Sequence, residues 1–598
     1  MIDFNVRLGF TTKMVVIFSL IIGHSTAVGS QPPPNIVLIL ADDLGFSDLA
    51  GYGSEIATPN LTALATQGLS FTNYHTGANC TPSRGMLLTG VDSHRAGVPN
   101  IPEMIPAAQA EYPHYTGTLG HNVVTVASLL QSSGYHTYLA GKWHLGQTPD
   151  KLPSQRGFER TVALGDSGAD NWQQKPYLPI YERANWYADG KRFSLPDDFY
   201  SSRFLVDKMV EFIGGPPDDG RPFFAFLPLQ AVHIPVQAPQ IFIDRYTGVY
   251  DSGWHELRER RRNNAIALGI VPADSAMVEM ASTDNWHALS AERQAYEAKR
   301  MAVYAGMIEA MDHHIGRLVR HLKATQQYEN TVFIFSSDNG AESLGRAHQD
   351  SWVNRRALAT QGYSADYKTL GLEGSFNAIS PSFASAAVAP LSHYKFYVGE
   401  GGMRVPLIIA GERIVMKNQL TDAFAFVTDI APTIRNLAGL DKTSDYFGGR
   451  KVEPMIGHDL TGLLDGTQTR AYSAHEPVGF ELAGHGALFL GDYKITLNRG
   501  TYGDGEWHLY NIKVDPGETR DLSSAEPLKL HLMLHHYHNY LADNQVLPLP
   551  QGYRHEIQMV VNAIHGLLRP NVLIGIILML VVIPFVIATR QRLQKRPK

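Results

Sequence analysis

Two uninterrupted apolar runs restrict what this chain can fold into more than any other feature of its sequence. They are residues 35–41, NIVLILA, and residues 331–336, TVFIFS. Short apolar runs rich in β-branched residues are typical of strands buried on both faces, as in a parallel sheet. Each run is followed within two residues by acidic or amide side chains, namely Asp42, Asp43, Asp338 and Asn339. Because parallel strands end at one edge of a sheet, we expect these side chains to gather there.

A helix is predicted between the two runs. Apolar residues recur there at helical spacing, at Met307, Met311, Ile315, Leu318 and Leu322. This pattern predicts an amphipathic helix over roughly 295–323 that leads into the second strand. Strands that alternate with helices indicate an α/β fold, so we expect a large, mixed or mostly parallel central sheet sandwiched by helices.

A smaller unit is predicted toward the end of the chain. Residues 486–490 and 492–496 resemble strands, and residues 527–541 resemble a helix. We therefore place a carboxyl-terminal α+β subdomain at 466–550, after a larger main domain at 34–465. Between residues 246 and 286 lies a segment rich in Arg and Glu, which we interpret as an insertion over the sheet.

The amino terminus has the pattern of a secretory signal peptide. Arg7 and Lys13 precede the apolar run 14–22, and the small residues 25–27 follow it. We predict a signal peptide at 1–27, cleaved near Ala27. An uncleaved membrane anchor is the alternative, and it would keep the same orientation.

The carboxyl terminus carries a second apolar segment. Residues 572–588 contain no charge and are followed by the basic residues Arg590, Arg592, Lys595, Arg596 and Lys598. This pattern predicts a transmembrane helix at 571–589 and a basic cytoplasmic tail at 590–598. The bulk of the chain would then be exported, on the periplasmic or extracytoplasmic face of the membrane. Since the run is short for a bilayer, a buried terminal helix is the alternative.

Charge and cysteine content narrow the function. The net charge is -6, and the 51 Lys and Arg residues are spread along the chain without a basic stripe, which argues against nucleic acid as a partner. Cys80 is the only cysteine, so no intrachain disulfide can form. An unpaired thiol in an oxidising compartment is a liability unless it has a function or is converted chemically.

The surroundings of Cys80 resemble the C-x-P-x-R signature of the sulfatase family. The sequence there is Cys80-Thr-Pro-Ser-Arg84. Other segments look like further sulfatase motifs and occur in the family's order over about 34–522: Asp42-Asp43, Gly141-Lys-Trp-His-Leu-Gly146, His233 before Pro235, Asp338-Asn-Gly340, and Lys395 before Glu400-Gly-Gly-Met-Arg-Val-Pro406.

The resemblance implies an alkaline-phosphatase-like fold and a mechanism. A separate maturation enzyme would convert Cys80 to formylglycine (3-oxoalanine). The hydrated aldehyde would attack the sulfur of a small sulfate ester, with transient sulfation of residue 80, and His233 would be the general acid. The implied catalytic residues are Cys80, Arg84, Lys142, His144, His233 and Lys395. The implied metal ligands are Asp42, Asp43, Cys80, Asp338 and Asn339.

The side chains of this ligand set favour a hard cation. Asp42, Asp43, Asp338 and Asn339 offer oxygen atoms, which suit Ca²⁺ or Mg²⁺ better than zinc. We expect one divalent ion, Ca²⁺ first and Mg²⁺ second.

Two other functions stay open at this point. Related formylglycine hydrolases cleave phosphonate or phosphate esters with nearly the same residues, and a membrane-tethered binding protein could retain the fold without the chemistry. Within the sulfate esters, Tyr246, Tyr250 and Trp254 resemble a segment of bacterial arylsulfatases and modestly favour an aryl substrate.

Overall fold

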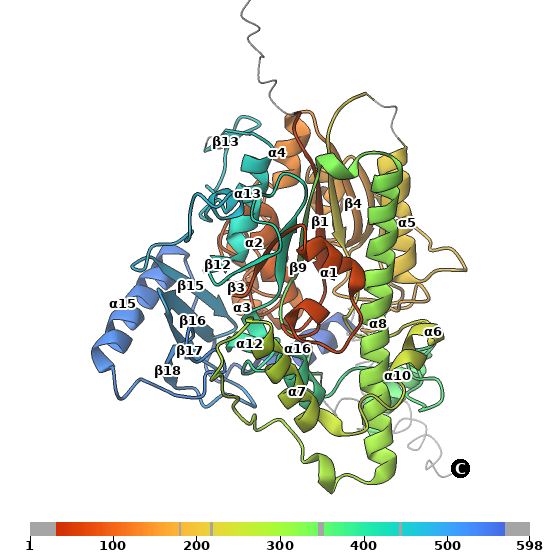
Figure 1. The fold of residues 1–598 in the computed structure, drawn as a ribbon, viewed down its shortest axis with the longest axis vertical. Helices are drawn as coiled ribbons and strands as arrows, with labels where there is room; N and C mark the ends of the chain where they lie inside the picture. The colour runs from red at the N-terminus through yellow and green to blue at the C-terminus, as the bar shows by residue number, and fades with distance from the viewer. Residues whose placement is uncertain (1–31, 179–180, 216–218, 345–351, 442–444, 568–598) are drawn as a thin grey trace, which may run out of the picture.

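The computed structural model describes residues 32–178, 181–215, 219–344, 352–441 and 445–567. A ten-stranded sheet forms its centre, in the order β11-β2-β10-β9-β1-β8-β4-β5-β6-β7, and helices cover both of its faces (Figure 1). The predicted α/β class with a large mixed sheet is confirmed.

The two apolar runs are neighbouring strands at the middle of this sheet. Strand β1 (Asn35–Ala41) pairs in parallel with β9 (Thr331–Ser337) on one side and with β8 (Phe223–Pro228) on the other. Strands β4 (His136–Lys142) and β5 (Arg160–Leu164) continue the parallel part. Four adjacent strands, β9, β1, β8 and β4, therefore end at the same edge.

The outer strands make the sheet mixed. On one side, β10 (Leu407–Ala410) runs antiparallel to both β9 and β2 (Gly68–Phe71), and β11 (Gln419–Thr421) pairs in parallel with β2. On the other side, β6 (Trp186–Ala188) and β7 (Lys191–Arg192) are antiparallel additions.

Strand β1 is apolar throughout because it faces a core on each side. Val37, Ile39 and Ala41 pack in the core that contains α5 (Ser201–Gly214) and α8 (Ala291–Ala324). The alternate residues of β1 pack in the core of α2 (Cys80–Thr89), α4 (Val126–Ser132) and α13 (Ile430–Leu437). Helix α8 contains the amphipathic helix that the sequence predicts at 295–323.

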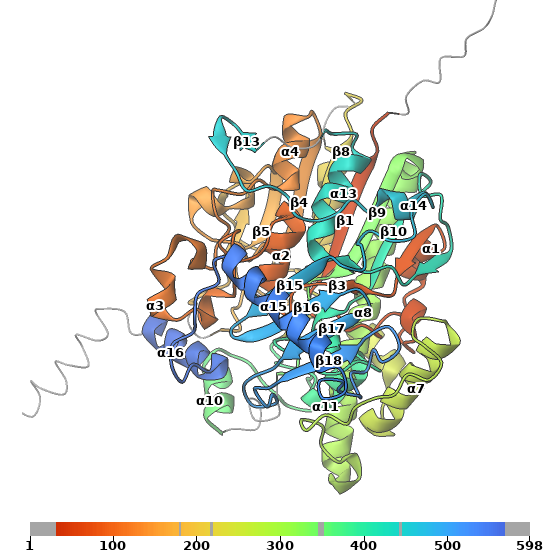
Figure 2. The same ribbon diagram turned by 90° about the vertical axis from the view of Figure 1, so that its left-hand side faces the viewer.

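A separate antiparallel sheet lies beside the main one. It consists of β15 (Pro477–Leu482), β16 (His485–Leu490), β17 (Tyr493–Leu497) and β18 (Trp507–Asn511), and α15 (Pro527–Asp543) packs across it (Figure 2). Leu488, Ile495 and Met533 belong to its small core. These elements are the α+β unit expected within 466–550, while the exact domain boundaries stay predictions.

Both predicted terminal segments, the signal peptide at 1–27 and the membrane helix at 571–589 with its tail, lie outside the described residues. Among the helices of the described ranges, none combines the length and apolar character that crossing a bilayer requires.

Candidate active site

The expected polar residues meet at one edge of the central sheet. Asp42 directly follows β1, Asp338 follows β9, Lys142 is the last residue of β4, and His233 lies in the loop after β8. All four side chains are at least 94% buried. The carboxyl ends of four adjacent parallel strands thus build the floor of the site, as ligand sites of α/β proteins commonly do.

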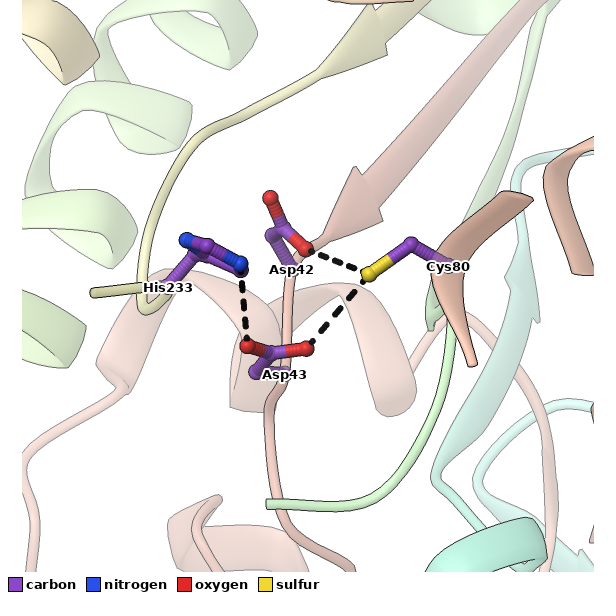
Figure 3. Close-up of side chains that lie close together, drawn as sticks. All are labelled: Asp42, Asp43, Cys80 and His233. Atoms are coloured by element: carbon purple, nitrogen blue, oxygen red, sulfur yellow. Dashed lines mark hydrogen bonds and ion pairs between the residues drawn. The ribbon is translucent and has the colours of Figure 1, made fainter. Parts of the chain in front are cut away.

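Cys80 is the first residue of α2 and lies over this floor. The side chain of Asn79 caps the helix, because its Oδ1 accepts a hydrogen bond from the Cys80 backbone N–H at 2.7 Å. Cys80 Sγ lies 3.6 Å from Asp42 Oδ1 and 3.8 Å from Asp43 Oδ1 (Figure 3). The cysteine is only 2% exposed.

Arg84 lies one helical turn after Cys80, so the C-x-P-x-R spacing places both side chains on one face of α2. Its Nε donates to Asp338 Oδ2 at 2.8 Å, and its NH1 donates to the backbone oxygen of Lys142 at 2.9 Å. Arg84 therefore fastens the start of α2 to the ends of β9 and β4.

The two predicted lysines pair with the carboxylates of the predicted metal set. Lys142 Nζ lies 2.7 Å from Asp42 Oδ2, and Lys395 Nζ lies 2.8 Å from Asp43. Lys395 also contacts Glu342 Oε2 at 3.1 Å. Together with Arg84, these lysines place three cations beside the acidic groups of the site.

Each of the two histidines of the site has its Nδ1 close to a polar neighbour. His144 Nδ1 is 3.2 Å from Thr81 Oγ1, and its buried Nε2 has no hydrogen-bond partner among the described residues. His233 Nδ1 is 2.6 Å from the backbone oxygen of Ile234, and its Nε2 lies 3.6 Å from Asp43 Oδ2. Burial, reinforced by nearby cations such as Lys142, holds the pKa of both imidazoles well below the ordinary value.

Burial and neighbouring charges shift the pKa values of the two aspartates in opposite directions. Burial raises the pKa of Asp42 to about 7 against the opposing effect of Lys142. Burial would also raise the pKa of Asp43, but Lys395, His233 and Lys142 together hold it below its ordinary value. Asp43 is therefore the more firmly ionised of the pair.

The chain adopts a strained backbone at two of these residues. Asp43 has φ 63° and His144 has φ 53°, which is the left-handed region that residues with a Cβ rarely occupy. Such a conformation costs about 1–3 kcal/mol per residue and persists where the surrounding structure enforces it. At Asp43, the backbone N–H donates to Asp338 Oδ1 at 3.2 Å, which links the two strand ends.

The site has the donors that a hard divalent cation requires. One ligand atom from each of Asp42, Asp43, Cys80 and His233 lies within 4.8 Å of the others. Asn339 donates its Nδ2 hydrogen to Asp43 Oδ1 at 2.8 Å, which leaves its buried Oδ1 without a partner in the described part of the chain. An orphaned carbonyl oxygen beside two carboxylates fits a cation that prefers oxygen ligands.

The catalytic and metal-binding residues expected from the sequence thus meet in one place, and the structure adds three more residues to the site. Glu342 pairs with Lys395, Thr81 contacts His144, and the ring of Tyr177 lies 5.5 Å from that of His233, edge to face. Glu342 follows the Asp338-Asn-Gly340 motif by two residues, so proximity in sequence could have indicated it. Nothing in the sequence marks Tyr177.

The aromatic residues of the insertion do not line a substrate pocket, contrary to the sequence-based expectation. Tyr246, Tyr250 and Trp254 are at least 95% buried in the main core. Trp254 packs edge to face against Trp286 and Phe383. The three rings fill the core beside α7 (Gly253–Ala267), to which Trp254 belongs, so they give no argument for an aryl substrate.

The fold and the site together indicate a class of protein. The site combines buried carboxylate and amide oxygens that suit a cation, buried basic side chains and a cysteine at the start of a helix, at the edge where parallel strands end. These groups suit a hydrolase for anionic esters. The comparisons with known proteins make the class specific. The model of the sulfatase family matches residues 34–440.

Curated relatives agree with this match. An uncharacterized sulfatase of Schizosaccharomyces pombe is 34% identical over 87% of this chain and 95% of its own length. An arylsulfatase of Klebsiella aerogenes is 35% identical over 75% of this chain and 96% of its own length. The chain belongs to the sulfatase family and is an enzyme that hydrolyses sulfate esters.

Solved structures share the fold. The crystal structure of Ps i-CgsB in complex with k-i-k-neocarrahexaose superposes with a TM-score of 0.61 at 22% identity, over 90% of this chain and 98% of that one. The PsFucS1 sulfatase from Pseudoalteromonas sp. gives a TM-score of 0.55 at 21% identity, over 85% and 90%. The alkaline-phosphatase-like architecture expected from the sequence is confirmed.

Proposed function

We propose that this sulfatase acts on aryl sulfates through a formylglycine made from Cys80 by a separate maturation enzyme. One observation carries the assignment of the nucleophile: Cys80 Sγ lies within 3.8 Å of both Asp42 and Asp43, which also form the candidate cation site. A formylglycine at this position would supply, as its hydrate, a hydroxyl nucleophile for sulfur and a second hydroxyl that allows sulfate to leave. An unmodified serine could not release sulfate in that way.

Asp42, Asp43, Asp338 and Asn339 would hold the divalent cation, with residue 80 as a further ligand. We propose Ca²⁺, with Mg²⁺ as the second candidate, because flexible carboxylate and amide oxygens suit the larger ion. Bound there, the cation would lower the pKa of a hydroxyl at residue 80 and stabilise developing negative charge.

The charge of the site favours an anionic substrate once the cation is bound. Four carboxylates lie beside three basic groups: Asp42, Asp43, Asp338 and Glu342 against Arg84, Lys142 and Lys395. Since these charges nearly balance, a bound divalent cation leaves a net positive centre in a buried environment, where electrostatic attraction is strong. Lys142, Lys395 and His144 would bind the sulfate oxygens, and Arg84 would hold residue 80 in position.

His233 is the proposed general acid. Its Nδ1 faces the backbone oxygen of Ile234, to which it can donate, so its Nε2 is the atom directed into the site. An anionic ester beside the ring would raise the low pKa of the imidazole and favour a proton on Nε2. That proton would go to the leaving oxygen, and His144 could share this role.

The aryl preference rests on the similarity to the Klebsiella aerogenes arylsulfatase. It is tested by steady-state kinetics on enzyme purified from a host that converts Cys80. We expect 4-nitrophenyl sulfate to be cleaved with a kcat/KM at least tenfold above that for a 6-O-sulfated monosaccharide, and above that for 4-nitrophenyl phenylphosphonate. The reverse ranking would assign the enzyme to carbohydrate sulfates or to phosphonate esters.

We also propose that the catalytic domain is exported and tethered by a carboxyl-terminal membrane helix at 571–589, with the basic tail in the cytoplasm. The support is the uncharged run 572–588 and the five basic residues after it. Protease treatment of intact cells or spheroplasts should degrade the catalytic domain and spare an epitope placed after residue 598. Protection of the catalytic domain would contradict the orientation.

A further inference from the structure

The last described helix, α16 (His555–Leu567), presents an apolar stripe to the outside of the molecule. Ile557, Val560, Val561 and Ile564, here called the α16 stripe, are 52%, 57%, 38% and 47% exposed. Their spacing of three and four residues places them on one face of the helix. The described residues leave this face uncovered.

The opposite face of α16 is directed toward the protein and is mixed, with polar side chains beside Met559, which packs partly buried against the core that contains α2. Asn562 donates its Nδ2 hydrogens to the backbone oxygens of Glu103 and Ile105, each at 2.9 Å. Gln558 donates to Asn562 Oδ1 at 2.8 Å, and His555 is buried. The α16 stripe lies on the side of the helix away from these contacts. A contiguous exposed aliphatic face of this kind marks an interaction surface.

The size of the stripe argues against a second protein chain as its partner. Four half-exposed aliphatic side chains offer roughly 350 Å², whereas a stable protein interface buries about 800 Å² on each partner. A bilayer surface needs no such minimum, because an amphipathic helix binds it with a narrow apolar face.

The sequence after α16 points to a bilayer. Residues 568–571 separate the helix from the uncharged run 572–588 and span at most about 18 Å when fully extended. A chain anchored by that run therefore keeps α16 near the membrane surface. We propose that the α16 stripe inserts into the interfacial layer of the lipid bilayer, as a second contact beside the carboxyl-terminal anchor. This inference rests on the proposed anchoring and is independent of the catalytic assignment.

The test uses the full-length chain bound to phosphatidylcholine vesicles. Ile564→Cys on the stripe and Leu528→Cys on α15, where Leu528 is 88% exposed, receive the same environment-sensitive fluorophore. Cys80 is buried, and the parent chain carried through the same labelling reports any background. Flotation of the protein with the vesicles is measured first, followed by quenching with iodide in water and with nitroxide-labelled lipid.

We expect the protein to float with the vesicles, and the label at 564 to be about threefold less accessible to iodide than the label at 528 and to be quenched by the nitroxide lipid. Equal accessibility of the two labels would overturn the docking of the stripe and leave the anchor standing. Protection from iodide without quenching by lipid would also overturn it, because a second copy or another segment of the chain would then cover the stripe. Failure to float would overturn the anchor and the stripe together, while hydrolysis of 4-nitrophenyl sulfate by the same samples reports the catalytic function separately.

Discussion

Lys494 on β17 donates to Glu400 Oε1 at 2.8 Å, and both side chains are completely buried. Lys494 also lies 3.1 Å from Glu518 Oε1, and Glu518 in turn accepts a hydrogen bond from the backbone N–H of Glu400 at 2.9 Å. Because Glu400 follows Lys395 by five residues, the smaller sheet is tied by buried charges to the segment that delivers a lysine to the active site.

Lys494→Met should therefore destabilise the protein strongly. The substitution removes the cation that Glu400 and Glu518 share, and breaking a buried ion pair typically costs about 3–5 kcal/mol in the free energy of unfolding. Because Glu400 keeps its contacts with His75 and Arg404, we expect the lower end of this range. Lys513→Met is the control, since Lys513 is 49% exposed and lies 3.7 Å from an exposed Asp422, and it should cost less than about 1 kcal/mol. Denaturant unfolding measures both, and equal small effects would show that the buried network is dispensable.

Cys80→Ser should abolish turnover and retain the fold. Serine is nearly isosteric with cysteine, and while its side chain remains an alcohol it has no second hydroxyl with which to release sulfate. In a host whose maturation enzyme converts cysteine only, we expect a loss of at least about 10³-fold in kcat. Mass spectrometry of the active parent should show the peptide with Cys80 about 18 Da lighter than the thiol form. Full activity with residue 80 shown by mass to be unmodified, as the thiol of the parent or the alcohol of the variant, would refute the proposed nucleophile.

Asn339→Ala should weaken binding of the divalent cation. The orphaned Oδ1 of Asn339 is lost, and we expect the Kd for Ca²⁺ to rise about tenfold or more. Titration calorimetry in the Cys80→Ser background measures binding without turnover. Asn436→Ala, at an exposed position on α13, is the matched control and should bind Ca²⁺ as the parent does. An unchanged Kd for Asn339→Ala would remove this residue from the ligand set.

The free energy of unfolding should decrease as the pH rises above neutrality, because of His94. Its Nε2 lies 2.8 Å from Glu481 Oε2 and its Nδ1 lies 3.3 Å from Asp92 Oδ1, so the ring links α2's flanking loop to β15. Burial alone would lower the pKa of His94, but these hydrogen bonds raise it to about 9. The unfolded value is about 6.5, so the charged imidazole stabilises the fold fully below that pH, and this contribution is lost as the pH rises through 9.

The free energy of unfolding should accordingly drop by about 3 kcal/mol more between pH 6 and pH 9.5 in the parent than in His94→Gln. His531→Gln, at an exposed position on α15, should keep the drop of the parent. Parallel pH profiles for the parent and His94→Gln would mean that His94 is not held in its charged form.

Much of the fold follows from local sequence patterns. The boundaries of β1 are those of the run 35–41, because a strand with a core on both faces is apolar over most of its length. The order of the strands was not predictable, since the pairing of β8 between β1 and β4 depends on the packing of the whole sheet. The edge strands are short and partly exposed, so their sequences lack the pattern that marks the centre.

The site residues that belong to a short sequence motif were predictable. The contacts between residues far apart in the sequence were not, because they depend on how the whole chain packs. Cys80 and Arg84 are recognisable in the sequence by the spacing of the C-x-P-x-R motif. The pairing of Lys142 with Asp42 and of Lys395 with Asp43 is visible only in the structure. The rings of Tyr250 and Trp254 misled the sequence-based interpretation, because an aromatic residue in an insertion reads the same whether it lines a pocket or fills a core.

The burial of Cys80 also imposes an order of events in time. The cysteine lies near the beginning of the chain, whereas β9, which closes the floor of the site beside β1, is formed by a segment beyond residue 330. A ribosome therefore releases the Cys80 segment long before the chain can enclose it. The proposed conversion to formylglycine would therefore take place in this interval, before folding encloses Cys80. A molecule that folds first would keep its thiol.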